Sequence, residues 1–225
     1  MSTEPSPKDV RAERLRGFGP LGLLAVVLIL TGNLLVAPVS AILVLLWAWA
    51  SRTPWLEIGF VRPRSWTASL ALGVVLGSAF KLVMKAIVMP LLGAPAINPA
   101  YHYLAGNQAA LPGMIFAVTA GAGFGEETVF RGYLFERLGK VFGGRRGAKA
   151  AIVLLTAALF GMAHHHDQVL PGVEQATITG LVFGGIFAVT GRLWGLIFAH
   201  AAFDLTALAI IYWDVEPAVA HFVFR

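Results

Sequence analysis

Long apolar runs dominate the chain, and charged residues stand mainly in the short segments between these runs. A helix that crosses the ~30 Å hydrocarbon core of a bilayer needs about 20 apolar residues. Runs of this length, bounded by charge, glycine or proline, predict an all-α bundle of about seven transmembrane helices (seven to eight), the first two separated by a turn at Gly32-Asn33. The predicted spans are residues 15–32, 33–51, 66–91, 111–138, 147–166, 172–190 and 193–213.

The loop charges agree with a chain that crosses the membrane alternately. Lys and Arg accumulate on the cytoplasmic side of membrane proteins. The basic segments all fall on one side if seven helices alternate, and the uncharged loop 93–110 falls on the other, so we expect a cytoplasmic N-terminus and an external C-terminus. The basic segments are the N-terminal tail 1–14, residues 52–64 with Arg52, Arg62 and Arg64, residues 140–149 with Lys140, Arg145, Arg146 and Lys149, and Arg192.

Composition narrows the class of protein further. The chain has 225 residues, of which 57% are hydrophobic and 13% charged, and its mean hydropathy is +0.75. The formal net charge is +5, but the basic residues are distributed between apolar runs, which favours membrane topology over nucleic-acid binding. Because the chain contains no cysteine, disulfides, thiolate metal sites and a cysteine nucleophile are excluded. We predict one integral membrane domain over 1–225, with a retained first span and a motif-bearing core at 110–210.

Six of the ionisable residues inside predicted spans could form one polar cluster, and each ionisable group in a span needs a partner or a function. Glu127 and Arg131 are four residues apart on one helical face and can pair. Glu126 lies about 100° away on the same helix, so it lacks this local counter-charge and is a candidate general base. The alternative is that both glutamates belong to a structural network. The other three are His164, which ends one span, and His200 and Asp204, which share a face of the last span.

Elimination narrows the chemistry of this polar cluster. No serine follows Ser78, so the half of the chain that holds the cluster has no serine nucleophile. His-Glu-x-x-His is absent as well, and so is the Gly-x-Gly-Asp expected of an aspartyl intramembrane protease. A water activated by a base remains, with or without a metal.

Three motifs together resemble a known family. They are Glu126-Glu127 with Arg131, Phe160 with His164, and His200 with Asp204. Their order and spacing are similar to those of the CPBP intramembrane proteases. This family is also called the Abi or CAAX-protease family, and it includes the eukaryotic prenyl-protein endopeptidase. Residues 56–63 look like an upstream element that many bacterial members carry.

The resemblance implies an endopeptidase in which Glu126, assisted by His164, activates a water that cuts a peptide bond near the membrane. His200 and Asp204 would stabilise the oxyanion, while Glu127, Arg131 and Phe160 would support the site. An ionised Asp204 would repel the oxyanion, so it must be protonated, orient His200 or help to hold a cation. Zn²⁺ on Glu126, His164 and His200 and a metal-free mechanism both stay open.

Lys81 and Lys85 are four residues apart within the third predicted span. Their ammonium groups could snorkel to the membrane surface, which we favour. Alternatively, they face the cavity and bind the C-terminal carboxylate of a substrate. For His165 and His166, next to His164, we favour solvated positions over a metal site.

Counting ~1.5 Å per residue from the cytoplasmic ends places His200, Glu126 and His164 at about 10, 20 and 25 Å depth. Straight helices would therefore not bring them together. Either the helix continues beyond the membrane into the basic loop, or it bends at Gly121 to Gly125, where we expect a kink and an inward, water-filled cavity.

The predicted function is cleavage near the C-terminus of a membrane-associated or prenylated peptide or protein, in the cytoplasmic membrane of a prokaryote. The expected partners are this substrate and the lipid bilayer, without nucleic acid. Two alternatives are a non-catalytic immunity or scaffold protein of the same fold and a proton-coupled transporter. The intact Glu126, His164 and His200 argue against a decayed site, and a transporter would not need the spacing of His200 and Asp204.

Overall fold

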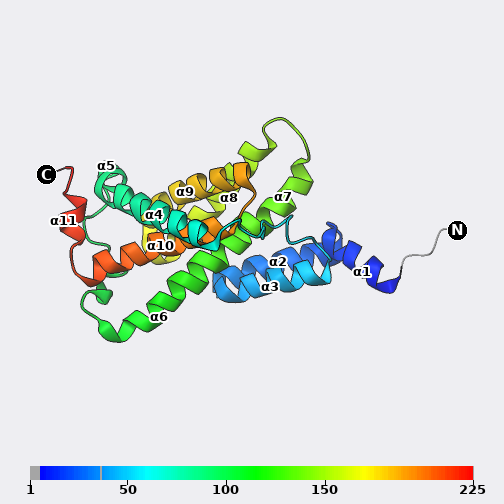
Figure 1. The fold of residues 1–225 in the computed structure, drawn as a ribbon, viewed down its shortest axis with the longest axis horizontal. Coiled ribbons are helices and arrows are strands. Elements are labelled where there is room, and N and C mark those ends of the chain that lie inside the picture. The colour runs from blue at the N-terminus through cyan, green and yellow to red at the C-terminus, as the bar shows by residue number, and fades with distance from the viewer. Residues whose placement is uncertain (1–5, 36, 225) are drawn as a thin grey trace.

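The structure is a computed structural model that describes residues 6–35 and 37–224 (Figure 1). The described part of the chain is helical and contains no strand, which confirms the predicted all-α class. Of the predicted N-terminal tail 1–14, residues 1–5 lie outside the described residues. The main α-helices are α1 (Pro7–Arg16), α2 (Pro20–Leu35), α3 (Ala37–Ala50), α4 (Trp66–Val83), α5 (Met89–Leu91), α6 (Leu111–Phe116), α7 (Leu134–Phe142), α8 (Ala148–Ala163), α9 (His165–Thr190), α10 (Trp194–Tyr212) and α11 (Glu216–Ala220).

Several of these helices are long and apolar enough to cross a membrane. Within the described residues there are four: Trp66–Leu91, Gln108–Phe142, Gln168–Thr190 and Trp194–Tyr212. A fifth results if Pro7–Arg16 and Pro20–Asn33, which meet at 56°, form one broken span. Pro38–Ala50 and Ala148–Ala163 are shorter apolar helices. The chain is therefore a multi-pass membrane protein, and seven spans with their cytoplasmic N-terminus stay a prediction.

The first helical hairpin turns later than its sequence predicts. Helix α2 continues through Gly32-Asn33 to Leu35, and α3 begins at Ala37 with Pro38 in its first turn. Proline suits a helix start because the first backbone N–H groups have no partner within the helix. A Cβ on Gly32 would lie 3.3 Å from Leu43 Cδ1, so glycine here allows the two helices to approach.

The connection between α8 and α9 also differs from the expected turn at 167–171. Helix α8 ends at Ala163, and α9 begins at His165 instead of residue 172. Val169 interrupts α9 with φ 47° and ψ −153°, two residues before Pro171. Because proline lacks an N–H and restricts the preceding backbone, the chain bends at this point rather than forming an extended loop.

The longest helix departs from α-helical geometry around Glu126 and Arg131. Between α6 and α7, two π-helical segments, η4 (Ala117–Glu126) and η5 (Thr128–Tyr133), continue the helix. Gly121 to Gly125, where the sequence predicts a kink, lie instead in wide π-helical turns within one continuous helix, and such turns are frequent at functional sites. The helix also continues to Phe142, beyond the predicted end at 138. Of the two routes considered for bringing the polar residues together, the fold therefore has a counterpart of the longer helix.

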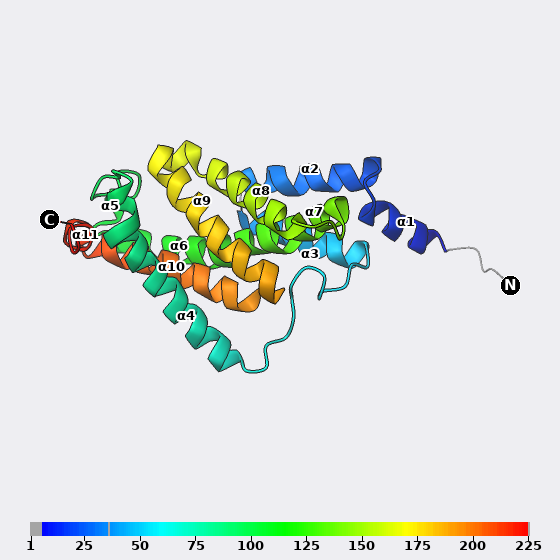
Figure 2. The same ribbon diagram turned by 90° about the horizontal axis from the view of Figure 1, so that it is seen from above.

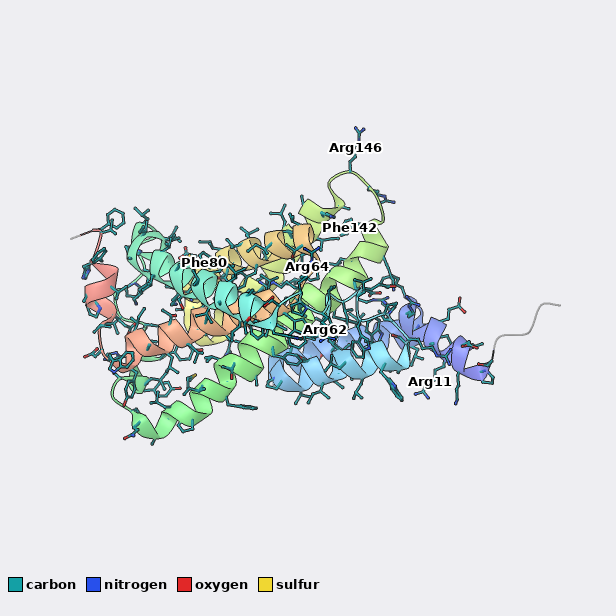
Figure 3. The ribbon with its side chains drawn as sticks, in the orientation of Figure 1. Arg11, Arg62, Arg64, Phe80, Phe142 and Arg146 are labelled. Carbon is teal, nitrogen blue, oxygen red and sulfur yellow. The ribbon has the colours of Figure 1, made fainter. Side chains whose placement is uncertain are left out.

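This long helix runs diagonally across the molecule (Figure 1). The α2–α3 hairpin packs beside its η4 and η5 segments, while α4, α8, α9 and α10 form the remaining bundle (Figures 1 and 2). Helices α1 and α11 lie at opposite ends of the long axis in both views. Arg146 projects from the loop after α7, and Arg11 lies on α1 at the end opposite α11 (Figure 3).

Residues 51–65, which connect α3 to α4, are anchored inside the bundle. Ile58 is completely buried, and Gly59 accepts a hydrogen bond of 2.9 Å from the backbone N–H of Leu193. Gly59 has φ +81°, and a Cβ at this position would lie 2.5 Å from the ring of Phe187. The segment that resembles the upstream family element therefore fixes the start of α10 against η5.

Helices α4 and α10 make the closest helix contact around the site. A Cβ on Gly73 would lie 2.9 Å from the carbonyl oxygen of Gly195 and 3.1 Å from the amide nitrogen of Ala199. A Cβ on Gly77 would lie 1.9 Å from the carbonyl oxygen of Ala199 and 2.9 Å from the amide nitrogen of Phe203. Both helices advance in the same direction along this contact, so they are parallel. Small residues allow such close approach in lipid, where packing drives helix association.

We expect Gly77→Ala to destabilise the protein by more than ~2 kcal/mol, because a methyl group would force the α4 and α10 backbones apart. Thermal unfolding in detergent, followed by circular dichroism, measures the effect. Gly185→Ala in α9 is the matched control, since a Cβ there meets nothing within 4 Å. Equal midpoints for the two variants would contradict this packing.

Candidate active site

The two adjacent glutamates occupy different environments. Glu126 ends η4, and its side chain is 17% exposed and lines a large cavity. The side chain of Glu127 is fully buried. Within the described residues, Oε2 of Glu126 is buried and makes no hydrogen bond. A carboxylate on a cavity wall with such an oxygen can accept a proton from a water molecule or a substrate.

Glu127 joins two helices through one oxygen atom. Its Oε1 accepts a hydrogen bond of 2.8 Å from Arg131 Nη1 and one of 2.7 Å from His200 Nδ1. The ion pair predicted from the four-residue spacing is therefore confirmed, and the contact to His200 extends it to α10. Arg131 also lies over the ring of Phe160, 4.7 Å from its centroid. Such a cation–π contact stabilises a buried guanidinium group.

The contact with Glu127 orients His200. The carboxylate of Glu127 is paired with Arg131, so it accepts the hydrogen bond and Nδ1 of His200 carries the proton. Nε2 then points toward the other two acids, 3.8 Å from Glu126 Oε2 and 3.5 Å from Asp204 Oδ2. The side chain of His200 is 4% exposed, whereas that of Asp204 is 25% exposed. Nε2 is therefore the nitrogen that can serve a ligand in the cavity.

His164 lies between α8 and α9 and is oriented by its own helix end. Its Nδ1 is 2.8 Å from the carbonyl oxygen of Phe160, which can only accept, so Nδ1–H is the donor. Nε2 is left to act on a ligand, and the residue lines the same cavity as Glu126 and His200. His165 and His166 are exposed at the start of α9. His164 is thus the histidine of this run that faces the cavity.

Phe160 packs against both histidines. Its ring centroid lies 4.7 Å from that of His164 and 5.9 Å from that of His200. The ring also packs edge-on against Phe130 at 4.9 Å. Phe160 is 2% exposed, so the packing restricts the orientation of both imidazoles. Phe160, which belongs to the second family-like motif, thus packs between His164 and His200.

The cavity has a volume of about 960 Å³ and lies among α4, η4, α8, α9 and α10. This volume is within the range of sites that bind whole small ligands or short peptides. Its wall carries both apolar and polar side chains. Among those lining it are Lys81, Lys85, Met89, Tyr101, Glu126, Phe130, His164, Gln168, Gln175, His200, Phe203, Asp204, Leu208 and Glu216.

The sequence around this polar cluster matches the model of a known protein family. Residues 108–206 match the family described as "Type II CAAX prenyl endopeptidase Rce1-like". This segment of the chain belongs to the Rce1-like family. No curated protein and no solved structure matches the chain. The match confirms the family resemblance that the three motifs indicated, and it covers all three of them.

The cavity also contains the two lysines for which the sequence left two positions open. Lys81 and Lys85 both line the cavity. Lys81 Nζ donates to Gln175 Oε1 at 2.9 Å, and Lys85 Nζ to Glu216 Oε1 at 2.8 Å. Their ammonium groups are therefore directed inward, contrary to the snorkelling position that we favoured. Substrate binding by these lysines stays a prediction.

The donor atoms of this Rce1-like site are not arranged as a metal centre. Within the described residues, no group of three or more His, Asp or Glu side chains has the arrangement needed to hold a metal ion. Nε2 of His200 lies 3.8 Å from Oε2 of Glu126. Zn²⁺ on Glu126, His164 and His200 therefore stays a prediction, and no step below uses a metal.

Two polar residues of the cavity were missed from the sequence. Gln175 lies in α9 and accepts from Lys81, while Glu216 begins α11 and is 1% exposed. Glu216 also accepts from the backbone N–H of Asn98 at 3.0 Å, so it fixes the loop 93–110. A search for uncharged polar residues inside spans would have found Gln175. Glu216 gives no local signal, because it lies outside the predicted spans.

Proposed function

We propose that this Rce1-like protein is an intramembrane endopeptidase in which Glu126 activates water. The observation that carries the proposal is the position of Glu126. Its carboxylate lies on the cavity wall, 3.8 Å from Nε2 of His200. The buried Glu127–Arg131 pair lies behind it. Glu127 is occupied by two partners, which leaves Glu126 as the carboxylate of the pair that faces the ligand.

The proposed reaction proceeds by two proton transfers. Glu126 takes a proton from water, and the resulting hydroxide attacks the carbonyl carbon of the scissile peptide bond. A doubly protonated His200, held by Glu127 through Nδ1, donates a hydrogen bond from Nε2–H to the oxyanion. The tetrahedral intermediate then collapses as the C–N bond breaks. The leaving amine receives the proton held by Glu126, assisted by His164, so the products are an amine and a carboxylic acid, which releases its proton to water.

We propose as substrate a membrane-associated peptide, prenylated or unprenylated, that is cut near its C-terminus. Family membership supports this class, because the matching family is named for CAAX prenyl endopeptidases. The cavity supports it as well, since apolar side chains such as Phe130 and Leu208 and the polar cluster line the same space. The abundant Ala, Gly and Arg favour a prokaryotic cytoplasmic membrane as the location.

The direct test uses purified protein in detergent with matched prenylated and unprenylated reporter peptides. The wild-type protein is expected to cleave at one bond, to keep its activity after treatment with a chelator, and to lose at least ~100-fold in His164→Ala. Absence of cleavage by the wild-type protein on both peptides would instead favour a non-catalytic scaffold. Loss of activity in chelator, restored by Zn²⁺, would contradict the metal-free mechanism.

A further inference from the structure

Asp204 presents an electrostatic difficulty for the proposed function, on which this inference rests. Its Oδ2 lies 3.5 Å from Nε2 of His200, the donor proposed for the oxyanion. A carboxylate at this position repels the negative charge that develops on the substrate oxygen. A nearby cation would offset this repulsion. The described residues contain one in a suitable position.

The register between α4 and α10 places Lys81 beside Phe203, the residue that precedes Asp204. Along the parallel contact, Gly73 meets Gly195 and Ala199, and Gly77 meets Ala199 and Phe203. One further turn of α4 leads to Lys81, which lines the same cavity as Asp204. The ammonium nitrogen of Lys81 lies 4.7 Å from the centroid of the Phe203 ring, next to Asp204 in the chain.

Lys81 is buried, and it lines the same cavity as Asp204. It is 8% exposed, and it donates a hydrogen bond to Gln175, which is neutral. Among the described residues, no carboxylate oxygen lies within ion-pair distance of its ammonium nitrogen. The opposite charges of Lys81 and Asp204 lie close enough to attract each other. A buried ammonium group needs such a counter-charge.

Lys85, one turn further along, already has a different partner. Its ammonium group pairs with Glu216 at 2.8 Å and donates to the carbonyl oxygen of Ala96 at 2.6 Å. The two lysines therefore line the same cavity but have different hydrogen-bond and ion-pair partners. Lys85 holds α11 and the loop 93–110, whereas Lys81 has its charge available to the catalytic end of the cavity.

We propose that Lys81 is a positioning residue that acts through Asp204, offsetting the charge of this carboxylate so that negative charge can develop beside His200. Removing the ammonium group weakens this compensation and slows the chemical step. Removing the charges of both Lys81 and Asp204 removes the repulsion of the oxyanion by Asp204 and also the need for Lys81 to offset it. The activity lost on substitution of Lys81 is therefore recoverable by a neutral isostere at position 204.

The test compares Lys81→Met, Lys81→Arg, Asp204→Asn and the double variant Lys81→Met/Asp204→Asn, with kcat and KM measured separately on peptides with free and amidated C-termini. We expect Lys81→Met to lower kcat about 30-fold with little change in KM, and Lys81→Arg to keep most of the activity. The double variant should return to within about threefold of Asp204→Asn. The matched control is Lys85→Met, which Asp204→Asn should not restore.

Several outcomes would overturn the proposal. Additive losses in the double variant would show that Lys81 and Asp204 are independent. A raised KM for free-carboxylate peptides alone, with kcat unchanged, would assign Lys81 to binding of the substrate's C-terminus. Recovery of Lys85→Met by Asp204→Asn would show a general effect of cavity charge. The proposed function is tested separately by wild-type cleavage and its dependence on Glu126, and thermal midpoints identify any variant that fails to fold.

Discussion

Replacing Glu126 with glutamine is expected to abolish peptide cleavage and leave the helix bundle folded. Glutamine has nearly the same shape but cannot take a proton from water. The loss of a general base typically costs 10²–10⁴ in rate, so we expect kcat to fall at least ~10³-fold. Oε2 of Glu126 makes no hydrogen bond within the described residues, so few contacts change. Initial cleavage rates in detergent measure the effect.

Glu57→Gln is the control for this substitution. Glu57 is an exposed acid that pairs with Arg16 at 3.3 Å, outside the cavity. We expect it to keep wild-type activity, because a surface ion pair contributes little. Glu126→Gln activity above a tenth of the wild-type rate, with wild-type KM, would exclude Glu126 as the base.

Replacing Glu127 with alanine is expected to reduce both stability and activity. Arg131 would remain buried without its carboxylate, and Nδ1 of His200 would lose its acceptor. Removing one partner of a buried ion pair typically costs about 3–5 kcal/mol. Loss of the residue that orients a catalytic histidine adds about 10–100-fold in rate. Thermal unfolding and cleavage rates measure the two effects on the same preparation.

A second variant separates charge from packing at this pair. Glu127→Ala/Arg131→Met removes both charges, so it should unfold at a higher temperature than Glu127→Ala alone. Its activity should stay low, because His200 still lacks an acceptor. If Glu127→Ala alone had wild-type stability and activity, the supporting role of the buried pair would be wrong.

The local part of the site could be predicted from the sequence because helical spacing determines it. Glu127 and Arg131 pair as their four-residue separation predicts. Glu126 lies about 100° around the helix from Glu127, so spacing alone assigns the two glutamates different roles. His200 and Asp204 likewise share a face, with 3.5 Å between Nε2 and Oδ2.

The remaining features depend on contacts between distant segments. The ten-residue π-helical stretch η4 keeps the long helix continuous where the glycines predicted a kink. The bond between Glu127 and His200 joins residues 73 positions apart. The pair of Lys85 and Glu216 spans 131 positions. Periodicity within one helix contains no information on these pairs, so the inward direction of Lys81 and Lys85 could not be predicted.

The most direct test of the central claim is mass spectrometry of the products that purified protein makes from a membrane-associated peptide in H₂¹⁸O. If Glu126 activates water, the wild-type protein yields two fragments from one cut, and the new carboxyl group carries one ¹⁸O atom. Glu126→Gln yields neither fragment. Fragments from Glu126→Gln at the wild-type rate, or cleavage without incorporated ¹⁸O, would contradict the account.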